Sequence, residues 1–298
     1  MRQAMKLFHN NLNKNQLAHP MRWTIAIILT ALCGVSFAQP TKYDKSRELG
    51  IAVGTAYYIG EINPTSHFGT RLKLSGGLTY RENLSKRWTI KTGLLYGQVE
   101  AWDADSDDPW MRNRNLHFRN QFFEGSMIAE LNFFDYQIGN RQNWISPYLF
   151  AGLGYYSMKP QANFKGNWYE LQPLGTEGQG TSEGEKKYSI SGLSAPFGAG
   201  LKMNVWAIFA LSLDWGVRKT WTDYFDDIST TYADPDLLED ENGELASLLG
   251  DQSLVKEGPA GNNAGMQRGD PGRKDWYFFC MLSLNIRLDK APNSCWGK

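Results

Sequence analysis

The sequence has few of the residues from which most catalytic and metal sites are built. Its 298 residues include three cysteines and four histidines, and beyond residue 38 only Cys280, Cys295, His67 and His117 remain. The two cysteines make no metal-ligand spacing and no disulfide framework. No serine, histidine and acid stand at a spacing that predicts a nucleophile with its base. We therefore predict no catalytic residue, no cofactor, no metal site and no enzymatic activity.

Long hydrophobic runs and an excess of positive charge are also missing. The apolar stretch Trp23–Leu32 is shorter than the ~20 residues that a transmembrane helix needs. The 31 basic residues include four within the first 38 positions, whereas all 31 acids follow, so the remainder carries a net charge of −4. This charge gives no indication of nucleic-acid binding. Helix-building periodicity of Ala, Leu, Glu and Lys is scarce as well.

The short apolar stretch has the features of an export signal. Arg22 supplies a basic n-region, Trp23–Leu32 the apolar core, and Ser36–Ala38 a cleavage site with small residues. This arrangement predicts a secretory signal peptide that is cut at the end of that site. Residues 1–38 are then an N-terminal extension and signal. The start of translation, Met1 or Met21, stays open.

The sequence is rich in two-residue alternation, which is clearest in Ala207–Lys219. A period of two indicates a β-strand, because successive side chains point to opposite faces. One face of this stretch is apolar, and the other carries Asp214 and Arg218 among small residues. Its length matches the roughly 9–11 residues of a strand that crosses a bilayer. Seven more such strands are predicted at Leu49–Gly60, Arg71–Arg81, Trp88–Ala101, Phe118–Phe134, Ile145–Met158, Ser189–Met203 and Trp276–Asp289.

Short and long connections alternate between these eight strands. The short ones are Glu82–Arg87, Asp135–Trp144 and Asn204–Trp206, and the long ones are Glu61–Thr70, Trp102–His117, Lys159–Tyr188 and Thr220–Asp275. Outer-membrane barrels have short periplasmic turns and long outside loops. The fold class is therefore all-β: residues 39–298 are predicted to form an eight-stranded antiparallel up-and-down transmembrane β-barrel. In the last loop, Asp234-Pro235 predicts the start of a short helix.

The faces of the strands predict what fills and what surrounds the barrel. Eight strands leave an interior just wide enough for side chains, so inward charges should pair and close the lumen. We expect this inward set to be Lys73, Lys91, Glu124, Glu130, Lys202, Asp214, Arg218 and Arg287, with room made by Gly54, Gly77, Gly93, Gly152, Gly200 and Gly216. Aromatic residues near strand ends predict interfacial girdles facing lipid. They are Tyr57, Tyr58, Tyr80, Trp88, Tyr96, Phe134, Tyr148, Tyr155, Trp215, Trp276 and Tyr277.

Charged residues in the loops give weaker signals. Asp103, Asp105, Asp107 and Asp108 begin like a calcium loop, but Asp108 stands where glycine is needed and Arg114 where glutamate is needed, so we interpret them as a solvated acidic loop. Asp223, Asp226, Asp227 and Asp234 could hold a cation, which is the less favoured interpretation. Arg112, Arg114 and Arg119 either dock an acidic partner or pair with nearby loop acids. We interpret Arg268-Gly269-Asp270 as a coincidence.

Five stretches of the chain resemble a known family. They are YYIGEINP (Tyr57–Pro64), RNRNLHFR (Arg112–Arg119), LQPLGTEGQG (Leu171–Gly180), TDYFDDISTTYAD (Thr222–Asp234) and DWYFF (Asp275–Phe279). In this order they are similar to the PorG-like outer-membrane barrels of the type IX secretion and gliding machinery of Bacteroidota. The resemblance implies a barrel without enzymatic activity that anchors a periplasmic ring and its motor. The alternative is a stand-alone barrel, similar to OmpA and OmpX, that maintains the envelope or binds surface ligands.

Overall fold

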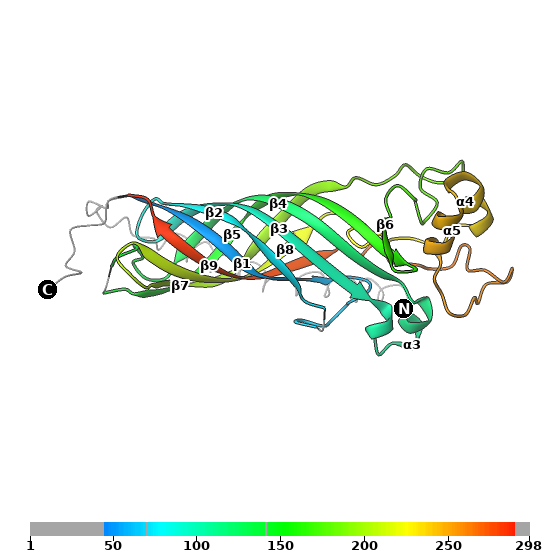
Figure 1. The fold of residues 1–298 in the computed structure, drawn as a ribbon, viewed down its shortest axis with the longest axis horizontal. Helices are drawn as coiled ribbons and strands as arrows, with labels where there is room; N and C mark the ends of the chain where they lie inside the picture. Colours follow the sequence, from blue (N-terminus) through cyan, green and yellow to red (C-terminus); the bar gives the residue numbers. More distant parts are fainter. Residues whose placement is uncertain (1–44, 70, 141, 290–298) are drawn as a thin grey trace, which may run out of the picture. The chain divides into compact units, whose positions relative to one another are not determined.

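A computed structural model describes residues 45–69, 71–140 and 142–289, which contain a closed antiparallel β-barrel (Figure 1). The predicted signal, the choice of start site and Cys295 lie outside these residues. Eight strands form the ring: β1 (Ser46–Ile59), β2 (Lys73–Asn83), β3 (Trp88–Trp102), β4 (His117–Asn132), β5 (Ile145–Phe164), β7 (Ser191–Asn204), β8 (Phe209–Thr220) and β9 (Trp276–Arg287). Each strand of the ring pairs with the next one along the chain, and pairing of β1 with β9 closes the ring. The short β6 is not part of the ring, because β5 pairs with β4 on one side and with β7 on the other. The predicted fold class is confirmed.

The prediction missed the outer part of the fifth strand. We expected this strand to end at Met158, but β5 continues to Phe164 and returns as β6 (Asn167–Glu170). The turn between them has Lys165 at φ 50° and Gly166 at φ 87°. Two consecutive residues with positive φ are typical of a tight hairpin. Lysine is an unusual residue at the first position of such a turn, so the sequence carried little signal for it.

The two faces of the barrel strands differ as the alternation predicts. Outward side chains are mostly exposed and apolar, as at Ile51, Leu74 and Leu94, whereas inward ones such as Glu130 and Arg81 are buried. Among the described residues, no helix is long and apolar enough to cross a membrane.

The lumen is filled by paired charges, as predicted. The Glu130 carboxylate lies 2.6 Å from Lys202 Nζ, 3.0 Å from Lys91 Nζ and 3.2 Å from Arg81 Nε. Lys91 also reaches Asp214 at 2.7 Å, which links the charges of opposite walls. A lumen cavity of about 20 Å³ remains beside these side chains, which is room for about one water molecule.

The remaining members of the predicted inward set lie nearer the ends of the barrel. Towards one end Glu124 accepts a hydrogen bond from Tyr277 at 2.6 Å and lies 3.5 Å from Arg218 Nε. Arg287 is buried at the other end and donates to the Ile138 carbonyl at 2.9 Å. Lys73 differs from the prediction, because it lies at the half-exposed rim and pairs with Glu100 at 2.7 Å.

The predicted aromatic girdles need correction at four positions. Tyr58, Tyr148 and Tyr277 are buried, because they point into the lumen rather than towards lipid. Tyr57 is buried as well, beneath the loop that follows β1, where its ring stacks on Phe278. The other predicted members are exposed or half-exposed: Tyr80, Trp88, Tyr96, Phe134, Tyr155, Trp215 and Trp276.

The glycines make room less often for charged side chains than we predicted. A Cβ at Gly216 would clash with the Arg218 guanidinium, as expected, but a Cβ at Gly200 would meet the Tyr148 ring at 2.5 Å. The other inward glycines serve different contacts. Added Cβ atoms would meet backbone carbonyls of the adjacent strand at Gly54, Gly77 and Gly152, and the Ser126 hydroxyl at Gly93. Close approach of neighbouring strands is their main role.

Candidate functional site

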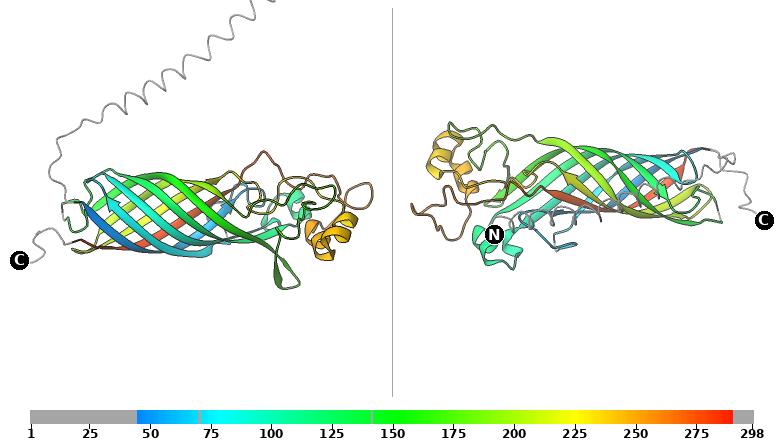
Figure 2. Two further views of the ribbon diagram at one scale, coloured as in Figure 1. Left: turned by 90° about the horizontal axis from the view of Figure 1, so that it is seen from above. Right: turned by 180° about the vertical axis from the view of Figure 1, so that it is seen from behind.

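The four long connections gather at one end of the barrel and form what we call the loop cap (Figures 1 and 2). It comprises residues 60–72, 103–116, 165–190 and 221–275, with residue 70 outside the described chain. The described residues of the short connections, 84–87, 133–140, 142–144 and 205–208, lie at the opposite end. The cap holds the elements η1 (Asp103–Asp105), α3 (Pro109–Arg114), α4 (Pro235–Asn242) and α5 (Glu244–Gly250).

Two of the cap helices begin with the same signal. Asp234 caps α4 by accepting a hydrogen bond from Asp236 N, and Pro235 is its first residue, as predicted. The predicted helix is divided at Gly243, whose φ of 94° ends α4 before α5 starts. Asp108 and Pro109 begin α3 in the same way. This helix was not predicted, because Asp108 was interpreted only as a loop acid.

Phe225 anchors the cap in the mouth of the barrel. Its ring is fully buried, stacks on Tyr277 with centroids 5.0 Å apart and meets Phe122 edge-on at 5.3 Å. The Phe225 carbonyl accepts a hydrogen bond of 2.6 Å from Asn120 Nδ2 on β4. The long loop before β9 therefore enters the barrel and closes it with an aromatic side chain.

A cluster of buried acids lies directly beside this plug. Carboxylate oxygens of Glu61, Asp226 and Asp275 lie within 4.8 Å of one another, and all three residues are buried. The Tyr58 hydroxyl lies 2.5 Å from Asp226 Oδ2 and 2.6 Å from Asp275 Oδ1. A hydroxyl has one proton to donate, so it can serve only one of the two carboxylates. Asp223 is buried nearby, and its Oδ2 accepts a hydrogen bond from Ser229.

Burial is the first cause of a raised pKa at each of these acids. It raises the pKa of Glu61 to about 7, with a further contribution from the charge of Asp223. It raises the pKa of Asp223 to about 6. The pKa values of Asp226 and Asp275 lie well above their usual range, because burial and then the neighbouring carboxylates disfavour the charged form. The cluster therefore needs protons or a cation to balance its charge.

Arg268 organises a second buried network in the cap. Its guanidinium lies 2.8 Å from Glu177 Oε1 and donates to the carbonyls of Asp227 and Gly250. Asp227 also accepts from the hydroxyls of Thr176 and Tyr188. Burial raises the pKa of Asp227 to about 6, and the Arg268 charge opposes this rise. In Arg268-Gly269-Asp270 the arginine is only 2% exposed and Asp270 is exposed, so the tripeptide does not present its arginine at the surface.

Among the acids and arginines around η1, Asp103 and Arg114 are buried, whereas Asp105, Asp107, Asp108 and Arg112 are exposed. Arg114 Nε and Nη2 contact the two Asp103 carboxylate oxygens at 2.7 and 2.8 Å. Both residues are buried, so the prediction of a solvated acidic loop is wrong for Asp103. Arg112 donates to the carbonyls of Ser106 and Asp107, and Arg119 lies 4.1 Å over the Trp168 ring. Of the two alternatives for these arginines, pairing within the loop holds for Arg114.

The structure brings the five stretches quoted above into this one assembly. Tyr57–Pro64 supplies Glu61 and Tyr58, Thr222–Asp234 supplies Phe225 and Asp226, and Asp275–Phe279 supplies Asp275 and Tyr277. Leu171–Gly180 supplies Glu177, and Arg112–Arg119 supplies Arg114, which donates to the Arg268 carbonyl at 2.7 Å. These contacts join residues from loops that are distant in sequence. Sequence periodicity could not reveal them, because it reports only local neighbours.

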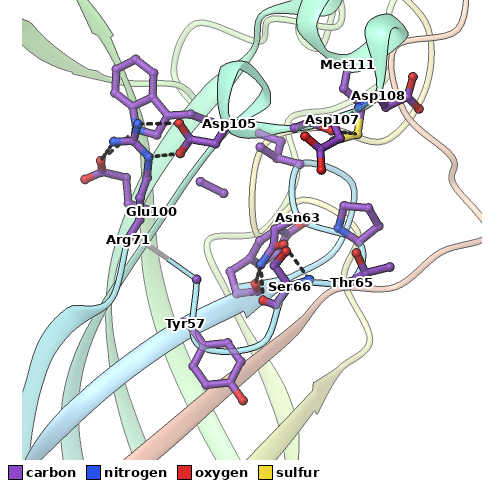
Figure 3. Close-up of a pocket in the computed structure, with 17 residues that line it drawn as sticks. Tyr57, Asn63, Thr65, Ser66, Arg71, Glu100, Asp105, Asp107, Asp108 and Met111 are labelled. Carbon is purple, nitrogen blue, oxygen red and sulfur yellow. Dashed lines mark hydrogen bonds and ion pairs between the residues drawn. The ribbon is translucent and has the colours of Figure 1, made fainter.

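A cleft of about 440 Å³ opens on one side of the cap (Figure 3). It lies between residues 57–69 with Arg71 and the segment around η1 and α3, and its lining includes Asn63, Thr65 and Ser66 on one side and Asp107 and Asp108 on the other. Arg71 lies 4.7 Å over the Trp102 ring and pairs with Glu100 and Asp105. Its charge is thus balanced within the protein. The cleft is of a size that holds small molecules, and its lining mixes aromatic with polar groups.

Comparison with known proteins identifies a family and similar structures. The model of the family described as "Domain of unknown function (DUF6089)" matches residues 24–242, well over half of the chain. No curated protein matches the sequence. Among solved structures, Ail of Yersinia pestis in complex with a heparin analogue is 11% identical, covers 82% of this chain and 99% of its own, and has a TM-score of 0.36.

Two further solved structures have comparable values. The N-terminal β-barrel domain of Pseudomonas aeruginosa OprF is 11% identical, covers 82% of this chain and 100% of its own, and has a TM-score of 0.33. A major outer membrane protein of Thermus thermophilus is 11% identical, with coverages of 81% and 99% and a TM-score of 0.38. Because each TM-score lies below 0.5, the assignment of the fold rests on the strand pairing itself.

Proposed function

The chain belongs to the DUF6089 family, whose function is unknown, and we propose that this protein is a non-enzymatic outer-membrane β-barrel that holds the loop cap at the membrane as a scaffold. The signal peptide in residues 1–38 would direct export and then be cleaved, leaving residues 39–298 as the barrel domain. Its first partner is the lipid of the outer membrane. No nucleic acid is involved.

One observation carries the membrane location: the barrel is apolar outside and charged inside. Ile51, Leu74, Leu94 and Leu153 are each at least 64% exposed, whereas Glu130 is completely buried. Soluble proteins rarely expose large contiguous apolar patches. Barrels that cross membranes have an outward apolar band and a polar interior. A lipid bilayer around the barrel would cover the apolar outer face and leave the charged inner face enclosed by the strands.

The filled lumen favours a scaffold over a channel. Glu130 and its three cationic neighbours cross the interior, Phe225 closes the mouth, and the lumen cavity beside these charges is of about 20 Å³. A solute larger than water would have to break several buried ion pairs to pass. The ordered surface that this barrel offers is the loop cap.

More specifically, we propose a role in the type IX secretion and gliding machinery, with periplasmic ring and motor proteins as partners. The resemblance of five stretches to PorG-like barrels supports it, and so does the concentration of those stretches in the loop cap. The orientation of barrels raises a conflict, because short turns normally face the periplasm and would leave the cap outside. Only small surfaces would then face a periplasmic ring, well short of the roughly 800 Å² per partner of a standard interface.

A labelling experiment determines on which side the cap lies. Ser182 is exposed in the cap, whereas Ser229 is 3% exposed and unsuitable for labelling. In a background with Cys280 and Cys295 replaced by alanine, we expect S182C to react with an impermeant maleimide on intact cells. The scaffold would then contact a periplasmic ring weakly and repeatedly, gaining strength by avidity, or through a bridging protein. Labelling only after permeabilisation of the outer membrane would show an inverted barrel whose cap docks the ring directly.

Deletion of the gene tests the scaffold role itself. The secretion-machinery proposal predicts loss of type IX cargo from the medium and loss of gliding, restored by the wild-type gene. A normal secretome with increased sensitivity to detergents or antibiotics would contradict it. That result would favour the second candidate function, a stand-alone barrel similar to OmpA and OmpX.

The cleft of Figure 3 is the observation that favours this second candidate. Its volume of about 440 Å³, its aromatic Trp102, its internally paired Arg71 and its lining acids suit a small polar ligand better than an anion. Substitution of Trp102 by alanine in the cleft would then reproduce the envelope phenotype of the deletion. The secretion-machinery proposal expects no such effect.

A further inference from the structure

We propose that Glu61, Asp226 and Asp275, with Asp223 beside them, form a calcium-binding site at the mouth of the barrel. The site does not depend on the membrane location or on the role in secretion proposed above. It replaces the expectation from the sequence that no metal is bound. That expectation considered Asp223 and Asp226 together with Asp227 and Asp234, two of which have other functions: Asp227 faces Arg268, and Asp234 caps α4.

The ligands come from both sides of one structural junction. Glu61 lies at the start of the loop after β1, Asp226 follows the Phe225 plug, and Asp275 directly precedes β9. β1 and β9 are paired strands, with Tyr58 opposite Tyr277. Strand pairing therefore fixes Glu61 beside Asp275, and the plug fixes Asp226 against both. Carboxylate oxygens of these three residues lie within 4.8 Å of one another.

Two carboxylate oxygens at the site are buried without any partner. Glu61 Oε2 and Asp223 Oδ1 accept no hydrogen bond, although the residues are only 9% and 3% exposed. A buried polar atom without a partner costs free energy, and Glu61 directs its carboxylate at Asp226 and Asp275. An ionised carboxylate can accept hydrogen bonds but cannot donate one, so its partner must be a donor or a cation. A bound cation is the partner that satisfies these oxygens.

The positive charges of the protein that act on these acids do so without direct contact, Lys274 on Asp223 and Arg114 on Glu61. Among the described residues, no ion pair includes any of the four carboxylates. Arg114 comes near, but its guanidinium is paired with Asp103. Its contact with Glu61 is to the backbone carbonyl, at 3.4 Å, and not to the carboxylate. The raised pKa values of Glu61, Asp226 and Asp275 agree with a shortage of positive charge beside these carboxylates. A dication would remove it.

The chemistry of the donors favours calcium among the common dications. All the ligands are oxygens, and none is a histidine or a cysteine, which argues against zinc and copper. Calcium binds oxygens at about 2.3–2.6 Å in irregular geometry, so oxygens on opposite sides of the ion are separated by about 4.6–5.2 Å. Magnesium requires near-octahedral ligands at about 2.0–2.1 Å. Carboxylates fixed by three separate backbone segments suit the more tolerant ion.

Calorimetry with calcium alone tests the proposal. The protein purified from membranes, treated with EDTA and dialysed, should bind one Ca²⁺ per chain, with a Kd of about 10⁻⁴–10⁻³ M or tighter, as in extracellular sites. Calcium should also protect the loop cap from proteolysis. The variant E61Q should bind at least tenfold more weakly, because it removes the negative charge and one oxygen of a carboxylate whose Oε2 accepts no hydrogen bond. The matched control D107N, an exposed cap acid, should bind like the wild type.

Several results would overturn the proposal. Absence of saturable binding to the folded wild type would mean that protons balance the cluster. Equal binding by E61Q and wild type would place the ion elsewhere, and tighter binding of Mg²⁺ than of Ca²⁺ would contradict the choice of ion. If E61Q fails to show the gel shift of a folded barrel on heating, D226N serves as the second ligand variant. If folded E61Q and folded D226N both bind calcium with the affinity of the wild type, the proposed site is excluded.

Discussion

Glu130 is the single residue on which the interior of the barrel depends most. Its carboxylate contacts three cations from three different strands: Arg81, Lys91 and Lys202. All four side chains are buried. Removal of one member of such a group destabilises the fold, because the remaining charges stay buried and unbalanced.

Replacing Glu130 by glutamine should therefore destabilise the barrel strongly. The change leaves three buried cations, of which Arg81 and Lys91 still lie near Asp214, and breaking a buried pair costs about 3–5 kcal/mol. Urea unfolding in lipid vesicles measures this loss. Glu82 faces outward on β2 and provides the control, since E82Q should change the free energy of unfolding by less than about 1 kcal/mol. Equal effects of the two substitutions would mean that the interior charges do not support the fold.

Period-two alternation correctly placed most of these charges inside, because a strand's side chains have only two directions. The same argument failed for Lys73, which has the inward parity but lies at the rim where Glu100 attracts it. The girdle prediction failed for Tyr58, Tyr148 and Tyr277 because it used their position near strand ends and not the alternation, which directs these side chains inward. Which charges meet depends on the register between strands, and single-strand patterns do not contain it.

At the scale of elements, the loop before β9 is a structural part of the barrel mouth. Phe225 inserts among aromatic rings from β4 and β9, and its carbonyl is bound by Asn120. The acids beside it and the Arg268 network hold the rest of the cap. Insertion of one large apolar side chain is thus the step that fixes the cap to the strands.

Shortening Phe225 should release the cap and leave the barrel closed. We expect F225A to lose about 3–5 kcal/mol of local stability, because truncating a buried phenylalanine removes contacts and leaves a cavity. Limited proteolysis should cut within residues 221–275 much faster than in the wild type, while the gel shift of the closed barrel on heating persists. F225L keeps most of the volume and should behave like the wild type. Unchanged proteolysis of F225A would contradict the anchoring role.

The elements themselves were largely predictable, whereas the cap was not. All eight barrel strands and the Asp234-capped helix follow from local patterns of two residues and of capping. The acid cluster does not, because Tyr58 and Asp275 are separated by 217 residues and meet only through the pairing of β1 with β9. Glu61 alone, in a glycine- and proline-rich loop, carries no signal of a site. Asp108-Pro109 carried a readable capping signal for α3 that was assigned to an acidic loop instead.

At the scale of the whole molecule, the two ends of the barrel are unequal. One end has connections of 4 to 12 residues, and the other carries a cap in which four loops share buried networks. The wall between them is apolar outside and charged inside. This arrangement gives one consistent account: lipid surrounds the wall, the filled lumen prevents flow, and the cap is the surface available to ions and partners.

The most direct test of this account is where the protein resides and in what form. We predict that cell fractionation recovers the protein in the outer membrane, that carbonate washing does not extract it, and that the unheated sample migrates faster on a gel than the boiled one. A closed barrel in lipid requires all three results, because its apolar wall cannot face water. Recovery as a soluble periplasmic protein, with identical migration before and after boiling, would contradict the central claim.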